Sequence, residues 1–104
     1  MKQFSNATVD AVANVYFEGK VVSHTIHLDD GSRKTLGVIF PGTYRFDTDA
    51  PEIMEITAGS CEVVIDGSAN TRFVPTDDSF EIAAKSGFSI TVNSGVCQYA
   101  CSYL

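Results

Sequence analysis

Turn-forming residues recur at short intervals along this chain, and this spacing constrains the fold more than any other feature. Groups of Gly, Asp, Asn, Ser and Pro separate short segments that are rich in Val, Ile, Thr, Phe and Tyr. The turn signals fall at 29–32, 40–42, 49–51, 66–68, 76–78, 86–87 and 93–95. Short strands with a turn every ~8 to 12 residues are typical of β-sandwiches and β-barrels. The sequence therefore predicts an all-β fold.

The segments between the turns predict strands at 19–28, 33–40, 43–47, 52–58, 60–65, 71–74, 79–82, 88–92 and 96–103. Asp30-Gly31 and Asp66-Gly67 indicate hairpins, and Gly59 divides one long apolar run into two strands. Helical periodicity is nearly absent, and one or two helical turns are expected only within 6–14. We predict an N-terminal arm at 1–15, lying on the barrel or on a partner, and a single β-barrel domain at 16–104.

Charge and cysteine content limit the cellular compartment and the binding partners that can be expected for the protein. Seven Lys and Arg against 13 Asp and Glu give a net charge of -6, which repels polynucleotides and anionic membranes. No apolar run approaches the ~18 residues of a spanning helix, and the first six residues do not resemble a signal peptide. The three cysteines lack C-x-x-C spacing, and Cys97 and Cys101 lie too far apart along one strand to pair. We therefore expect a soluble, cytoplasmic protein with free thiols.

Two pairs of candidate functional residues are each spaced three apart within predicted strands. Residues at this spacing face opposite sides of a sheet, so His24 and His27 cannot share a metal ion unless the strand bulges. For the same reason only one of Glu52 and Glu55 points into a barrel, and Glu52, beside Pro51, is the better candidate. A buried carboxylate must be paired or hydrogen bonded, whereas the alternative is a Glu52 exposed at the rim.

A resemblance to the cupins begins with Glu52, which is followed by six residues and Gly59. This spacing matches the second half of the first cupin motif, G-x5-H-x-H-x3,4-E-x6-G, and Gly42 fits its opening glycine. The three histidine positions of the two cupin motifs are occupied by Phe46, Thr48 and Phe88. Without these ligands the usual His/Glu metal site cannot form. The chain resembles a cupin-type β-barrel, a jelly roll, that has lost its metal ligands.

One family of small, metal-lacking cupins resembles the chain more closely, namely the pyrimidine/purine nucleoside phosphorylases. The matching residues are 17–21, 33, 36–39, 42–46, 51–54, 59 and 99–104. The resemblance covers residues 16–104 almost without gaps. It departs from the family at Ser102, where the family's C-R-Y-L ending has Arg, and at Asp77 and Ala83, where the family has Gly and Pro.

The resemblance implies reversible phosphorolysis of purine and pyrimidine nucleosides to free base and (deoxy)ribose 1-phosphate, with broad base specificity. Such a glycosyltransferase, more narrowly a pentosyltransferase, uses inorganic phosphate as co-substrate and needs no metal or organic cofactor. The alternative function is a metal-free cupin that binds a nucleoside or sugar metabolite without turnover, as a sensor or as a structural dimer module. A homodimer is expected in each case, because small jelly rolls commonly cover their sheet edges by pairing.

The implied chemistry suggests roles for particular residues. Glu52 is expected to accept hydrogen bonds from the sugar hydroxyls and to stabilise positive charge on the ring, and Arg33 to bind phosphate bidentately. Tyr103 is expected to donate a proton or a hydrogen bond near the leaving base. Lys20 is either a second cation for the substrate or an exposed strand lysine. The remaining predicted pocket residues are Tyr44, Phe46 and Phe88, which alternatively only pack in the core, and Tyr99. Tyr99 shares a strand face with Tyr103, so either both residues line the cavity or neither does.

Overall fold

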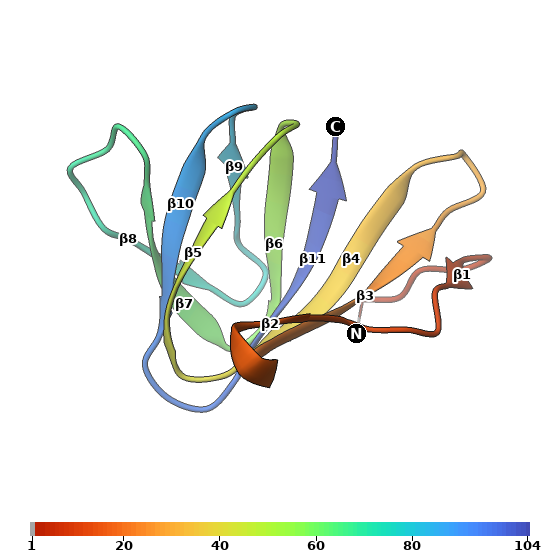
Figure 1. Ribbon diagram of the computed structural model, residues 1–104, viewed down its shortest axis with the longest axis horizontal. Coiled ribbons are helices and arrows are strands. Elements are labelled where there is room, and N and C mark those ends of the chain that lie inside the picture. The colour runs from red at the N-terminus through yellow and green to blue at the C-terminus, as the bar shows by residue number, and fades with distance from the viewer. Residues whose placement is uncertain (1) are drawn as a thin grey trace.

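Antiparallel strand pairing organises the computed structural model, which describes residues 2–104 (Figure 1). Seven strands form one sheet in the order β1-β3-β4-β11-β6-β9, with β2 also paired to β3, and four form a second sheet in the order β5-β10-β7-β8. Within these residues there is no α-helix, only the single 3-10 turn η1, and no helix capable of crossing a bilayer. The all-β prediction is confirmed. Residue 1, the first of the predicted arm, lies outside the described residues.

The elements are β1 (Thr8–Val9), β2 (Asn14–Tyr16), η1 (Phe17–Gly19), β3 (Val21–His27), β4 (Arg33–Ile39), β5 (Gly42–Asp47), β6 (Glu52–Ala58), β7 (Ser60–Ile65), β8 (Arg72–Pro75), β9 (Ser79–Ile82), β10 (Gly87–Val92) and β11 (Cys97–Tyr103). The strands from β3 to β11 lie within two residues of the predicted bounds. Both predicted hairpins form, because β3 pairs with β4 and β7 pairs with β8.

The prediction of helical turns within 6–14 is wrong, because this segment pairs with the edge of β3 instead. Thr8 and Val9 of β1 face His27 and Ile26, and β2 continues along the other half of the same strand. The side-chain amide of Asn14 donates to the hydroxyls of Ser23 and Thr25, each at 3.2 Å. The open edge of β3 offers backbone hydrogen bonds, and these outweigh the local capping signals.

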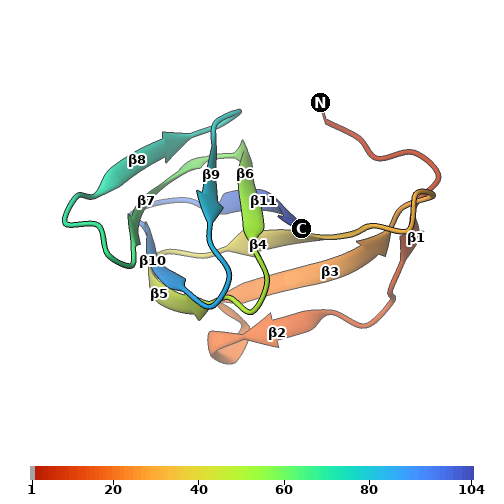
Figure 2. The same cartoon turned by 90° about the horizontal axis from the view of Figure 1, so that it is seen from above.

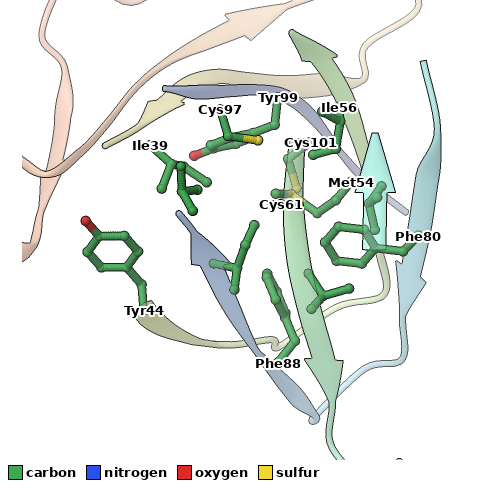
Figure 3. Packing of buried hydrophobic residues seen from close by; sticks show 14 of the residues in the cluster. Ile39, Tyr44, Met54, Ile56, Cys61, Phe80, Phe88, Cys97, Tyr99 and Cys101 are labelled. Atoms are coloured by element: carbon green, nitrogen blue, oxygen red, sulfur yellow. The ribbon is translucent and has the colours of Figure 1, made fainter. Parts of the chain in front are cut away.

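The core lies between the two sheets, which Figure 2 shows side by side, with β5, β7, β8 and β10 to the left of the larger sheet. The largest fully buried side chains are Phe80, Phe88, Ile39, Ile56, Ile82 and Ile90, and Figure 3 labels the first four of them. Strand β11 occupies the middle of the larger sheet, between β4 and β6. Its alternating residues Cys97, Tyr99 and Cys101 are buried, and the thiols of all three cysteines are free.

Gly59 transfers the chain from the larger sheet to the smaller one. It lies between β6 and β7 with a φ of +79°, a left-handed conformation that residues with a side chain rarely adopt. A Cβ atom at this position would also overlap the carbonyl oxygen of Val96. The predicted break in the apolar run is therefore confirmed, and this position requires glycine on both grounds.

Gly37 makes room for an aromatic ring. It lies opposite Tyr99 in the pairing of β4 with β11, and a Cβ atom on Gly37 would overlap the Tyr99 ring and its hydroxyl. The Tyr99 side chain is only 7% exposed, so the ring has little freedom to move away except into the space between the sheets.

We expect Gly37→Ala to lower the free energy of unfolding by about 1–3 kcal/mol, as is usual when extra atoms are forced into a packed site. The loss is to be measured by denaturant unfolding. The control is the same substitution in a Tyr99→Ala background, where the ring is absent and Gly37→Ala should cost much less. An equal loss in both backgrounds would contradict the proposed overlap.

Candidate functional site

A cavity of about 190 Å³ lies between the two sheets and is lined by residues from both. Its polar wall comes from the seven-stranded sheet, where Ser23, Thr35, Glu52, Cys101 and Tyr103 point inward. The facing wall, from the smaller sheet, presents the rings of Phe46 of β5 and Phe88 of β10, with Asp47 at the end of β5. The cavity thus combines hydrogen-bonding groups on one side with ring faces on the other.

Glu52 is the inward carboxylate of β6, as predicted, and it is half-buried. The Cys101 thiol donates a hydrogen bond to its Oε1, with 3.4 Å between sulfur and oxygen. Burial raises the pKa of the Glu52 carboxyl, while the Cys101 hydrogen bond and the positive charge of Arg33 act in the opposite direction. Glu55, on the opposite face of the strand, instead forms an ion pair with Lys2.

Tyr103 stands next to Glu52, because these residues pair across β11 and β6. Its hydroxyl lies 3.2 Å from the Thr35 hydroxyl, and burial raises its pKa to about 12. The Arg33 guanidinium sits over the Tyr103 ring, 4.1 Å from its centre, in a cation–π contact. Arg33 itself is exposed and does not line the cavity, so it lies at the rim beside Glu52 and Tyr103.

The aromatic wall is built from adjacent strands of the smaller sheet. Phe46 and Phe88 are paired in the β5–β10 ladder, and their rings are stacked with 5.7 Å between centres and 25° between planes. Phe88 is buried against Phe80, whereas Phe46 is partly accessible. Tyr99 lines the cavity from the opposite side, on β11 of the larger sheet, and shares that face of the strand with Tyr103.

Two predicted site residues lie away from the cavity. Tyr44 is buried at the edge of the core, where its hydroxyl donates to the backbone carbonyls of Phe40 and Pro41 at 2.8 and 2.9 Å (Figure 3). Lys20 is exposed just after η1, near the end of β4 opposite to Arg33. A seven-residue strand separates these ends by about 20 Å. Tyr44 therefore does not form part of the cavity wall, and Lys20 does not join Arg33.

Ser102, which replaces the family's arginine, points away from the cavity. Its neighbours Cys101 and Tyr103 line the cavity, so strand alternation turns Ser102 to the outer face of the sheet. There its hydroxyl accepts a hydrogen bond from the Lys34 ammonium. Ser102 therefore contributes no group to the cavity.

Several lining residues were not singled out from the sequence. Cys101 lies on the inward face of β11 that also carries Tyr99 and Tyr103, so the same alternation indicates it. Thr35 and Ser23 are small polar residues on central strands, and no motif marks them. Tyr16 lines the cavity from β2, a segment whose strand pairing the sequence did not predict.

The residues at the cupin histidine positions do not fit a metal ion. Phe46 and Phe88 present rings, and the Thr48 hydroxyl donates to the carbonyl of Ala83 at 2.6 Å. No group of three or more His, Cys, Asp or Glu side chains in residues 2–104 is arranged to hold a metal. His24 and His27 instead reach Asp10 at the sheet edge, at its carbonyl and its carboxylate respectively.

The arrangement of the two sheets is that of a cupin-type jelly roll. The cupin domain of Cnp3 from Schizosaccharomyces pombe superposes with a TM-score of 0.66 at 14% identity, over 89% of this chain and 63% of that one. A protein of unknown function from Acinetobacter sp. ADP1 is much more similar, with a TM-score of 0.95 and 39% identity over 98% of both chains.

The family model described as pyrimidine/purine nucleoside phosphorylase matches residues 11–103. A relative of that name from Methylococcus capsulatus is 50% identical over 99% of both chains. Another of that name, from Hydrogenovibrio crunogenus, is 46% identical over 100% of this chain and 99% of its own. The chain belongs to the pyrimidine/purine nucleoside phosphorylase family, as its sequence motifs predicted.

Glu52 makes folding stability depend on pH. A carboxyl ordinarily titrates near 4.5, and a higher pKa in the folded state means that stability falls as the pH rises from that value through the folded pKa. We expect Glu52→Gln to raise the melting temperature above that of the unmodified protein at about pH 8, with the difference vanishing near pH 4. Thermal unfolding across this range measures it.

Glu81→Gln, on the exposed side of β9, is the matched control for this effect. Its melting temperature should follow that of the unmodified protein at each pH. A Glu52→Gln variant that follows the same course would contradict the raised pKa.

Proposed function

We propose that this protein catalyses the reversible phosphorolysis of purine and pyrimidine nucleosides to free base and (deoxy)ribose 1-phosphate. The family's name supports a nucleoside phosphorylase. The observation that carries the proposal is the meeting of Glu52 and Arg33 at one end of a cavity with an aromatic wall opposite. The carboxylate suits a sugar, the guanidinium suits an anion, and the aromatic wall suits a planar base.

Glu52 holds the sugar in this proposal. As glycosidic bond cleavage advances, the sugar ring gains positive charge, which a nearby carboxylate stabilises. The two oxygens of Glu52 can also accept hydrogen bonds from sugar hydroxyls. Since Cys101 engages one oxygen, the other remains for the substrate. The half-buried position of Glu52 strengthens these interactions relative to an exposed carboxylate.

Arg33 binds the phosphate. Of the three arginines in the chain, Arg45 is paired with Asp66 and Asp47, and Arg72 with Asp78. Within residues 2–104, only Arg33 among them forms no ion pair with a carboxylate. Its planar guanidinium matches two phosphate oxygens at once, and its contact with the Tyr103 ring orients it beside Glu52. Phosphate bound there lies next to the sugar.

Phe46 and Phe88 receive the base. A ring face stacks on any nucleobase, whereas hydrogen-bond donors and acceptors would select among base edges. A wall of phenylalanines therefore accounts for a broad range of bases. Tyr103, whose pKa is about 12, acts as a hydrogen-bond donor to the leaving base, because an acid this weak transfers a proton poorly near neutral pH.

The other features of the proposal concern the whole protein. It works with phosphate as co-substrate and without metal or organic cofactor. It acts as a cytoplasmic homodimer, with residues 1–15 as an arm and residues 16–104 as the cupin barrel domain. Neither polynucleotides nor membranes are partners, in keeping with the net charge of -6.

We expect purified protein to release free base from inosine and uridine only when phosphate is present, and equally well with EDTA. Chromatography of the products measures the release. If no nucleoside of a panel gives phosphate-dependent release of free base, the proposal is wrong. If the same nucleosides raised the melting temperature without being cleaved, the protein would be a binding module instead.

Substitutions at the two charged residues test the site. Arg33→Ala should lower kcat/KM for phosphate by about 10- to 150-fold, the loss of a charged hydrogen-bonding group. Glu52→Gln should lower kcat by about 100-fold or more, because the neutral amide no longer stabilises the cationic ring. Steady-state kinetics with varied phosphate separates the two effects.

Arg72→Ala is the matched control, because Arg72 pairs with Asp78 away from the cavity. It should retain full activity. If Arg33→Ala is as active as Arg72→Ala, phosphate binds elsewhere.

A further inference from the structure

The seam between β2 and β5 is closed by aromatic side chains and not by strand pairing. Among residues 2–104, β2 pairs only with β3, and β5 only with β10. The Phe17 ring lies 5.0 Å from that of Tyr44 and 5.5 Å from that of Phe46, and the Tyr16 ring lies 6.2 Å from Phe46. No backbone ladder therefore joins this segment to β5, and on its other side Tyr16 is the last β2 residue paired with β3, opposite Val21.

The same segment carries unusual backbone strain. Phe17, Glu18 and Gly19 have φ angles of +52°, +58° and +91°, and the first two are left-handed residues with side chains. Such conformations cost free energy and often occur where a segment moves or binds a ligand. None of the three residues of η1 is buried, and its Phe17 side chain is 43% exposed. Packing therefore holds this turn only weakly.

Tyr16 joins this seam to the cavity. Its ring lines the cavity and is nevertheless 47% exposed, so it stands between the interior and solvent. Figure 2 shows β2 and η1 beside β3, on the side of the molecule where β5 lies. The 190 Å³ cavity is smaller than the ~300 Å³ at which binding sites for ligands of this size begin. To hold a nucleoside together with phosphate, the cavity must widen by movement of one of its walls. The wall at Tyr16 is the least constrained, because only aromatic contacts join it to β5.

We propose that Tyr16–Gly19 forms a flap that opens the β2–β5 seam to admit the nucleoside, and that the Tyr16 ring then covers the bound nucleoside beside Phe46. This deepens the proposed function and rests on it. The occupant is a nucleoside because a ring at this position faces the aromatic wall and lies on the side away from Arg33. Tyr16 contacts the substrate, whereas Phe17 anchors the closed flap to β5.

The absence of tryptophan from the chain allows a direct test with Tyr16→Trp as a single fluorescent reporter. We expect inosine or uridine to change its emission saturably and to reduce its quenching by acrylamide, at the concentrations that saturate turnover. The control, Phe73→Trp, places the reporter on β8, at a side chain that is 60% exposed and does not line the cavity. Its emission should not respond.

Kinetics test the opening step and the contact separately. In stopped flow, the observed rate of the emission change in Tyr16→Trp should reach a plateau with rising nucleoside, since opening limits entry. Tyr16→Ala should raise KM for nucleoside by at least about fivefold, as expected for loss of a stacking ring, with the melting temperature checking its fold. Tyr16→Phe keeps a ring at this position and should raise KM less than Tyr16→Ala does.

The outcomes separate the flap from the proposed function. Base release by the unmodified protein, together with an unresponsive Tyr16→Trp and an unchanged KM in a folded Tyr16→Ala, would overturn the flap alone. A rate that rises linearly with nucleoside would overturn the opening step. If the unmodified protein neither binds nor cleaves nucleosides, the proposed function and the flap fail together.

Discussion

The pairing of β11 with both β4 and β6 is the interaction on which the rest of the structure depends. It sets Tyr103 beside Glu52 and Tyr99 over Gly37, and so fixes which side chains face the smaller sheet. Because successive residues of a strand point to opposite faces, a shift of one residue would exchange the cavity lining for the outer surface. The closely fitted ring of Tyr99 above Gly37 resists such a shift, since no other residue of β4 leaves room for it.

Gly37 and the cavity illustrate how packing and chemistry share the same residues. Tyr99 fills the space that Gly37 leaves and also lines the cavity. Glu52 remains half-buried among hydrogen-bonding groups, and its raised pKa reflects incomplete compensation for its burial. A carboxylate in this position weakens the fold near neutral pH. Its retention in the interior is consistent with a role in binding, because a residue chosen for stability alone would be apolar.

Strand alternation and turn signals were readable in the sequence, whereas pairing across the sheets was readable only in part. Strand parity indicated that only one of Glu52 and Glu55 points inward and that Tyr99 and Tyr103 share a face, and Gly59 marked the break between two strands. Parity alone could not show that Tyr44 sits beyond the cavity, because its place depends on where the hydroxyl finds backbone carbonyl acceptors. The strands β1 and β2 were not predicted, because they are short and are stabilised by pairing with the edge of β3. Tyr16 was therefore missed with them.

The outward direction of Ser102 has a consequence for how members of this family can differ. One strand lines the cavity with Tyr99, Cys101 and Tyr103, whereas Ser102 lies on its other face and meets Lys34 there. Substitution on the outer side alters a surface without touching the interior a single residue away. The two faces of β11 are thus free to diversify independently, so that relatives can keep one interior while presenting different exteriors.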